Sequence, residues 1–427
     1  MKTFFDFFSF SDPNVQFVVV GMILLGIGTA TIGTFAFLRK RALTGDAIAH
    51  SVLPGVCLAF MLFDTRNLWV LLGGAFVTGW LSIIFVDLIT KKTKLKPDTA
   101  IGLTLSVFFG VGILLLTFIQ QSGNASQSGL NNFLFGKAAA MSTDDIRTMA
   151  VVSLFIIIVV VIFFKEFRLL SFDPDYAKST GLPVNFLQLT LTTLTVLAVA
   201  AGIQAVGVVL MAALLITPPA AAKYWTDKLG KMILLSILFA VIGSITGAYV
   251  SYANNKMPTG PWIVTMTSII AVMSILFAPK KGLIPKIIIR KKYQNKMLRE
   301  NILKELFHLE EKNPGKKSFT LSDIATEREM KTSNYIFGLR MLLRKDLVVK
   351  INDLYYLTEK GLDEGKRITR IHRLWEMYLT EKLNIASDHV HDDAEAIEHI
   401  ITPEIEKRLI ELLDKPEKDP HEKIIPY

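Results

Sequence analysis

Long, almost uninterrupted apolar runs fill the first two thirds of the chain, and the last third reads as soluble and mostly helical. A bilayer is crossed by a helix of roughly 20 apolar residues. About nine runs approach or reach this length, near 15–37, 45–63, 68–90, 99–119, 149–164, 184–201, 204–222, 232–252 and 261–278. Only the weak break Ala201–Gln204 separates the sixth from the seventh. The pattern predicts a mainly α fold that begins with a polytopic helical membrane bundle.

The chain changes character after Ala278. A basic stretch from Lys280 to Lys292 suits the anionic cytoplasmic leaflet. Helical patterns then cover about 297–312, 321–328, 332–346, 361–383, 388–400 and 402–413. Two short strands, 347–351 and 354–357, flank Asn352-Asp353, which is a hairpin signal. Three helices and a hairpin in this order indicate a winged-helix unit. We expect a transmembrane domain over 1–279, a basic juxtamembrane linker over 280–296, a winged-helix-like domain over 297–365 and a further helical domain over 366–427.

The net charge of +9 combines two oppositely charged parts. Residues 1–299 carry 26 Lys and Arg against 12 Asp and Glu, whereas residues 300–427 carry 21 against 26. In the membrane part, thirteen basic residues fall in one alternating set of loops and five in the other. The positive-inside rule therefore predicts an external N-terminus and a cytoplasmic C-terminal domain. A basic excess in the membrane part is not a nucleic-acid footprint, because such a footprint lies in the binding domain itself.

Two ionisable residues open the second apolar run. Asp46 and His50 stand at positions i and i+4, so their side chains share one face of a helix. Such groups are costly near hydrocarbon unless they are paired or used. Together they offer an oxygen and a nitrogen donor, which suits Mn²⁺, Fe²⁺ or Zn²⁺ better than Mg²⁺. The spacing fits equally well a local Asp–His pair that holds the helix end near the headgroups. The single cysteine, Cys57, allows no intrachain disulfide and no Cys-rich metal cluster.

The loop Phe172–Pro183 contains a segment bounded by Pro174 and Gly181 that predicts a short helix. A helix of this kind can stand off the membrane and seat in a groove of a partner. An ordinary solvated loop is the alternative. The sequence contains no GxxxxGK[ST] phosphate-binding motif, and the nearest fragment, Pro314–Ser318, lacks the loop spacing and the strand context. We therefore expect this chain to hydrolyse no nucleotide, and we expect no enzymatic activity in it.

Residue types that bind metals cluster between 372 and 399. Offsets of three and four keep the donors of each predicted helix on one broad face. The donors are His372, Glu376, His391, Glu395, Glu398 and His399. Imidazole and carboxylate donors without a thiol favour Mn²⁺, Fe²⁺ or Zn²⁺ in an octahedral or mixed site. A charged, solvated helix face is the alternative interpretation.

The membrane part resembles the ABC permease family that imports zinc, manganese and iron. The segment Gly45–Gly55 is similar to the signature of this family, and the likeness covers about residues 15–280. Further landmarks are Lys96–Gly102, Leu134–Gly136, Gln204–Gly207 and Ala212–Pro218. The resemblance implies that Asp46 and His50 line the translocation path and bind the metal transiently.

The same resemblance gives the loop at Phe172–Pro183 a function. In the family, the matching segment is the coupling helix that receives motion from the ATPase. The residues that would carry this function here are Asp173, Pro174, Ala177 and Gly181.

Residues 297–421 resemble the diphtheria-toxin-repressor and manganese-regulator family of metal-dependent repressors. The likeness rests on the segments His372–Glu376, His391–His399 and Asp419–His421. Glu395 stands where the iron-type members carry Cys, which places the site nearer the manganese type. The resemblance makes 366–427 a metal-binding and dimerisation domain.

One departure from the repressor pattern concerns the first helix, which also supplies ligands in that family. The matching positions here are Asn301 and Lys304. Asn is a weak ligand, and Lys is none at neutral pH. The site is therefore either incomplete or uses a nearby group such as Glu300 or Glu305.

We therefore expect the permease subunit of an ABC importer that moves a divalent transition metal (Mn, Fe or Zn) across the bacterial cytoplasmic (inner) membrane. Its cytoplasmic domain would sense the same metals and regulate transport. Expected partners are a separate ABC ATPase subunit, an extracytoplasmic metal-binding protein, a second copy of the chain in a homodimer, and membrane lipids. No permanently bound cofactor is expected, because the metal acts as substrate and regulator.

Two other functions compete with this expectation. A membrane-tethered, metal-dependent transcription regulator would need specific DNA binding. We do not expect DNA binding, because the candidate recognition helix, about Thr332–Lys345, is basic only near its end and lies in an acidic domain. An importer of organic chelates would need a wide apolar cavity without ionisable donors, which the spans do not suggest.

Overall fold

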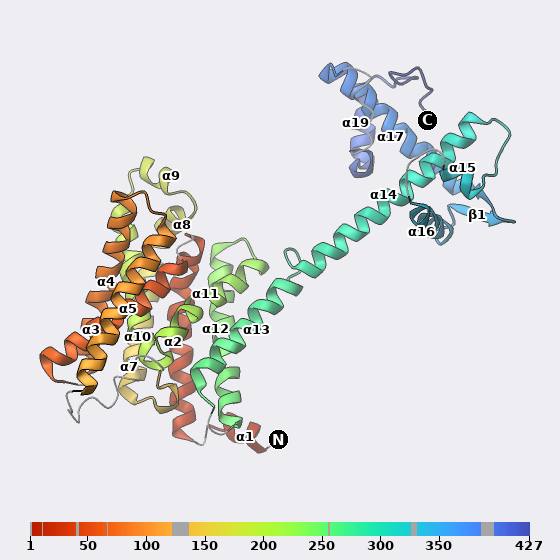
Figure 1. The fold of residues 1–427 in the computed structure, drawn as a ribbon. Helices are drawn as coiled ribbons and strands as arrows, with labels where there is room; N and C mark the ends of the chain where they lie inside the picture. Colours follow the sequence, from red (N-terminus) through yellow and green to blue (C-terminus); the bar gives the residue numbers. More distant parts are fainter. Residues whose placement is uncertain are drawn as a thin grey trace. The chain divides into compact units, whose positions relative to one another are not determined.

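The computed structural model describes residues 2–10, 12–39, 42–65, 67–121, 136–254, 257–325, 331–385 and 397–427. It divides into two compact units, Met1–Pro285 and Lys286–Tyr427, each drawn in Figure 1. The division falls a few residues after the end of the expected transmembrane domain at 279. The finer division of the second unit at 365 stays a prediction.

Eight described helices in the first unit are each long and apolar enough to cross a membrane. Figure 1 shows them running side by side as a bundle. They are α2 (Pro13–Leu38), α3 (Ala42–Phe63), α4 (Leu68–Lys92), α5 (Pro97–Gln121), α7 (Thr143–Ile162), α10 (Val184–Val206), α12 (Leu229–Ala253) and α13 (Thr259–Phe277). The predicted mainly α membrane bundle is thereby confirmed.

The seventh expected span corresponds to a separate helix, α11 (Val208–Trp225), which packs against α2, α3, α12 and α13. The break before it was expected at Ala201–Gln204, and this placement was wrong. Residues 201–204 continue helix α10, and the chain breaks at Gly207, whose φ is 89° and ψ 159°. Residues with a side chain rarely adopt this conformation, so the glycine and not the polar Gln204 decides where the helix ends.

Shorter helices complete the first unit. Apolar periodicity alone did not predict α1 (Lys2–Phe8), the 3₁₀ turn η2 (Ala138–Ala140) or α8 (Phe164–Phe172). Helix α7 begins six residues before its expected start at 149. Ser142 caps it by accepting a hydrogen bond from the Asp145 backbone N–H, and the Asp145 carboxylate accepts one from the Ser142 N–H in return.

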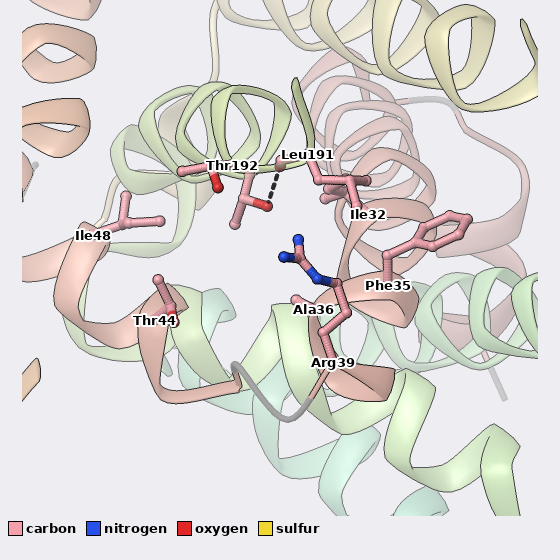
Figure 2. Close-up of a pocket in the computed structure, with 9 residues that line it drawn as sticks. Ile32, Phe35, Ala36, Arg39, Thr44, Ile48, Leu191 and Thr192 are labelled. Carbon is pink, nitrogen blue, oxygen red and sulfur yellow. Dashed lines mark hydrogen bonds between the residues drawn. The ribbon is translucent and has the colours of Figure 1, made fainter. Parts of the chain in front are cut away.

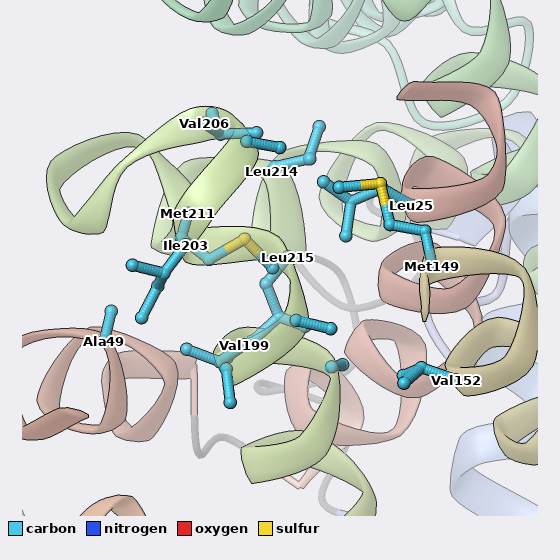
Figure 3. Close-up of a cluster of buried hydrophobic side chains, with 14 of the residues drawn as sticks. Leu25, Ala49, Met149, Val152, Val199, Ile203, Val206, Met211, Leu214 and Leu215 are labelled. Carbon is cyan, nitrogen blue, oxygen red and sulfur yellow. The ribbon is translucent and has the colours of Figure 1, made fainter. Parts of the chain in front are cut away.

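The core of the bundle is a contiguous set of buried aliphatic side chains. Figure 3 shows Leu25 of α2, Met149 and Val152 of α7, Val199 and Ile203 of α10, and Met211, Leu214 and Leu215 of α11 meeting in it, beside Ala49 of α3. Helices α3 and α4 approach each other closely where Gly55 faces Gly74. A methyl group at Gly55 would collide with the Gly74 carbonyl oxygen, and one at Gly74 with the Gly55 carbonyl. Glycine at both positions therefore fixes how α3 lies on α4.

The second unit contains the predicted order of helices and hairpin. Its elements are α14 (Leu283–Lys312), α15 (Leu321–Ala325), α16 (Thr332–Leu343), β1 (Val348–Ile351), β2 (Leu354–Leu357), α17 (Glu359–Leu383), η3 (Glu398–Ile400) and α19 (Pro403–Leu412). The strands pair antiparallel, with Val348 opposite Leu357, and Asn352 and Asp353 both have positive φ in the turn between them. Residues 283–296 of the basic stretch that was expected as a linker are helical and form the first half of α14. Ile302 and Leu306 of this helix pack with Tyr335, Leu339 and Ile368 in a core of their own.

Candidate functional sites

The first predicted site lies at the start of α3. His50 Nε2 is 3.5 Å from Asp46 Oδ1, and the two side chains are 16% and 38% exposed. The neighbours Ala47 and Ala49 are completely buried, so the helix turns the two polar side chains away from its packed face. The His50 ring stands edge-on to Phe109 of α5, at 4.8 Å between centroids. Within the described residues, His50 Nδ1 has no hydrogen-bond partner.

By itself this pair could supply only part of a metal coordination shell. The helix presents one carboxylate oxygen and one imidazole nitrogen, and the described residues contain no group of three or more His, Cys, Asp or Glu that could hold a metal ion. Zn²⁺ and Mn²⁺ take at least four ligands, so water or another chain would have to complete the shell. A two-donor site that is partly open can take up a cation and also release it.

A second polar feature of the bundle lies at the ends of α2, α3 and α10. Figure 2 shows the Arg39 guanidinium pointing into a cavity lined by Thr44, Thr192, Thr195, Ile32 and Ile48, among others. The Thr195 hydroxyl donates its hydrogen bond to the Leu191 carbonyl, at 2.8 Å. The Arg39 guanidinium makes this cavity less favourable for a cation than the Asp46–His50 pair.

The short helix predicted in the loop after α8 is present as α9 (Pro174–Ser179). Asp173 caps it by accepting a hydrogen bond from the Tyr176 N–H at 2.9 Å, and Pro174 occupies its first turn. Ala177 is buried, and Gly181 ends the turn with a φ of 82°. The helix is thus a preformed local element that exposes Tyr176. Its coupling role stays a prediction.

The second predicted site lies in the second unit, between α14, α17 and η3. His372 on α17 contacts Glu376 through Nε2, at 3.1 Å, and Glu398 of η3 through Nδ1, at 2.6 Å. Glu398 in turn accepts hydrogen bonds from the Lys304 ammonium with both oxygens, at 2.8 and 3.0 Å. All four side chains are buried. The structure therefore brings together three predicted ligands and a lysine, on elements far apart in the sequence.

The pKa values in this group follow from burial and pairing. Burial alone would lower the pKa of His372, but its hydrogen bonds to Glu376 and Glu398 outweigh burial and raise it. Burial alone would raise the pKa of Glu398, but its contacts with His372 and Lys304 prevail and lower it. The cluster thus favours an ionised carboxylate and a protonated imidazole.

His399, also predicted as a ligand, faces a different carboxylate. Its Nδ1 is 2.9 Å from Glu300 Oε2 on α14, and its Nε2 is 3.6 Å from Glu398 Oε1. Glu300 is one of the two residues named as substitutes for the missing first-helix ligand. Among the described residues, His399 Nε2 and the Asn301 side-chain oxygen are buried without a hydrogen-bond partner. Each of these atoms could coordinate a cation, but the described residues contain no group of three or more His, Cys, Asp or Glu that could hold a metal ion.

Two of the predicted ligands, His391 and Glu395, lie outside the described residues, as do Leu134 and Phe135 of a family landmark. An ion pair between a buried arginine and a partly exposed glutamate was not predicted from the sequence. Arg373 contacts Glu311 at 2.7 and 3.0 Å, and it also donates to the Ile424 carbonyl. Arg373 stands next to the predicted ligand His372 in the sequence, and this adjacency is the sequence feature that could have indicated the ion pair.

A multi-span helical bundle followed by a soluble helical unit with a hairpin defines the class of protein as a membrane transporter subunit with a fused domain. Residues 11–278 match the ABC 3 transport family, and residues 358–427 match the metal binding and dimerisation domain of iron dependent repressors. The first match covers more than half of the sequence, so the chain belongs to the ABC 3 transport family. Both resemblances drawn from the sequence are confirmed.

Named relatives agree with this assignment. The manganese transport system membrane protein MntC of Bacillus subtilis is 39% identical over 405 residues, which cover 94% of this chain and 92% of that protein. The zinc transport system membrane protein TroC of Treponema pallidum is 39% identical over 275 residues, 64% of this chain and 92% of that protein. A solved structure of PsaBC from Streptococcus pneumoniae in complex with Fab superposes with a TM-score of 0.58 at 35% identity, over 64% of this chain and 94% of the matched one. The likeness to MntC extends through the fused domain.

Proposed function

We propose that this chain is the permease subunit of an importer for a divalent transition metal, and that manganese or zinc is its substrate. The observation that supports this most directly is the Asp46–His50 pair on α3, with contact at 3.5 Å and both side chains partly open. The relatives named for manganese and zinc transport support the same substrates. Soft thiolate donors are absent from the pair, which agrees with Mn²⁺ and Zn²⁺ rather than Cu⁺.

The proposal assigns a function to the geometry of the pair. A fully built buried site would hold the cation too tightly, whereas two donors on one helical turn bind it briefly. Energy for the release comes from a separate ATPase subunit, for which α9 provides the contact. An extracytoplasmic metal-binding protein delivers the cation, and two copies of the chain enclose the path. The second unit lies in the cytoplasm.

Uptake of radioactive Mn²⁺ and Zn²⁺ tests the substrate site. The permease is reconstituted in vesicles with its ATPase and binding protein. We expect Asp46→Ala and His50→Ala each to reduce uptake at least tenfold, since each removes one of two donors. Cys57→Ala is the matched control, because Cys57 lies on the same helix and is buried. Uptake by Asp46→Ala and His50→Ala equal to that of wild type would refute the proposed site.

For the second unit we propose metal-dependent regulation of transport. His372, Glu376, His391, Glu395, Glu398 and His399 are the proposed ligands, supported by the buried cluster and the two orphaned atoms described above. We expect the double variant Glu395→Ala, His399→Ala to make uptake insensitive to cytosolic Mn²⁺. Uptake is measured in vesicles that contain Mn²⁺ on the side of the membrane that the second unit faces. Unchanged sensitivity in the double variant would exclude this regulatory role.

No observation favours the alternative of a membrane-tethered transcription regulator. The candidate recognition helix α16 exposes Ile336 and Phe337, which are apolar side chains. The hairpin turn carries Asp353, whose carboxylate pairs with Lys350 at 2.6 Å. DNA contacts need cationic groups on these two elements, and α16 exposes one, Arg340.

A further inference from the structure

The Lys304 ammonium occupies the position at Glu398 that a bound cation would need. Both carboxylate oxygens of Glu398 accept hydrogen bonds from it, at 2.8 and 3.0 Å. The Glu398 side chain has no exposed surface, and Lys304 is 8% exposed. This is a closed internal ion pair, in which neither partner exchanges freely with water.

The contacts of His372 complete the enclosure. One ring nitrogen meets Glu398 at 2.6 Å and the other meets Glu376 at 3.1 Å. Both ring nitrogens of His372 and both carboxylate oxygens of Glu398 therefore face an internal partner. A divalent ion could bind here only by taking Glu398 away from Lys304. That exchange would leave an ammonium buried without its counter-charge, which is costly in a protein interior.

The other end of the cluster differs. His399 Nε2 and the Asn301 side-chain oxygen are buried and lack hydrogen-bond partners among the described residues. Glu300 contacts the opposite nitrogen of the His399 ring. His399 Nε2, which lies 3.6 Å from Glu398 Oε1, is thus still available for coordination, whereas both nitrogens of His372 are taken up.

We propose that Lys304 permanently replaces a metal ion at the His372 end of the cluster, so that metal binding in this domain is confined to the His399 end. The ammonium supplies the positive charge that a bound metal ion would otherwise supply. It holds Glu398 of η3 against His372 of α17 whether or not metal is present. This inference rests on the proposed metal-binding role of the domain and restricts it to one end of the cluster.

Hydrogen–deuterium exchange of the full-length chain in detergent tests the proposal, with a chelator or with Mn²⁺. In wild type we expect residues 368–376 of α17 to be protected equally in both conditions. Lys304→Met removes the ammonium and leaves the Glu398 carboxylate without its cation, while His372 keeps its contacts with Glu376 and Glu398. Exchange over 368–376 should then become at least tenfold faster in chelator and return to the wild-type rate with Mn²⁺.

Two further variants separate this role from ordinary packing. Lys304→Arg keeps a cation and should behave as wild type, whereas Lys316→Met removes an exposed, paired lysine of the same unit and should change nothing over 368–376. The proposal is overturned if protection over 368–376 in wild type depends on Mn²⁺. It is also overturned if Lys304→Met exchanges like wild type, or exchanges faster and is not restored by Mn²⁺.

The same measurement reports separately on the proposed function. Residues 397–401 carry the His399 end, and their protection in wild type should rise with Mn²⁺. If it does not, the regulatory metal site fails even where the behaviour over 368–376 supports Lys304 as the internal cation.

Discussion

The two units of this chain treat the same kinds of ligand in opposite ways. In the membrane unit, Asp46 and His50 form a single partly open contact on one helix. In the second unit, His372, Glu398 and Lys304 come from three elements and are buried in a continuous set of ion pairs. A site that must release its ion on every cycle stays sparse and open. A site that must hold a shape can be dense and closed, because its charges are compensated inside the protein.

The largest expected effect comes from removing one charge in each unit by an isosteric change. Glu398→Gln leaves Lys304 buried without a full counter-charge, and breaking such a pair costs about 3–5 kcal/mol. Asp46→Asn breaks a partly exposed contact, which costs at most about 1 kcal/mol. Chemical denaturation of the full-length chain, followed separately through each unit, measures both values. Similar losses in the two units would remove the contrast drawn above.

A second prediction concerns pH and the second unit. Burial, followed by the charges of Arg373 and Lys304, lowers the pKa of His308 from 6.5 to about 3. Since the folded state then binds fewer protons than the unfolded state between these values, His308 contributes stability that is full above pH 6.5 and is lost as pH falls. The slope is about 1.4 kcal/mol per pH unit.

The matched variant isolates this contribution from the other titrating groups. His308→Gln keeps a polar side chain without the ionisation. Relative to this variant, the free energy of unfolding of wild type should fall by about 2 kcal/mol between pH 6.5 and pH 5. Chemical denaturation at each pH measures it. Parallel stability profiles for the two proteins would show that His308 is not the source of acid sensitivity.

The smallest expected effect concerns α9, which belongs to the membrane unit but carries no metal donor. Asp173→Ala removes the N-cap of a six-residue helix, and a lost cap costs about 1 kcal/mol. We expect uptake to fall by a factor of two to five, on the order of that energy, while ATP hydrolysis continues. Asp175→Ala is the control, since Asp175 lies on the same helix and does not cap it. Equal effects of the two variants would argue against a capping role in coupling.

Contacts within one helix could be predicted from the sequence, whereas contacts between residues far apart in the chain could not. The i, i+4 spacing of Asp46 and His50 and the Asn352-Asp353 turn were sufficient to predict a helical pair and a hairpin, because both depend on neighbours in the chain. The pairs Lys304–Glu398 and Glu300–His399 join residues 94 and 99 positions apart, and no periodicity encodes them. Asn301 and Lys304 were recognisable as departures from a ligand pattern, but only the packing of α14 against η3 shows what Lys304 does there.

The contact between Gly55 and Gly74 has a consequence for reading substitution data. Because a methyl group at either glycine would collide with the carbonyl oxygen of the other, α3 and α4 can approach this closely only with glycine at both positions. A larger residue at Gly74 would therefore push α4 away from the helix that carries Asp46 and His50. A variant at Gly74 that impairs uptake would indicate that Asp46 and His50 have been displaced. It would not be evidence for an additional ligand on α4.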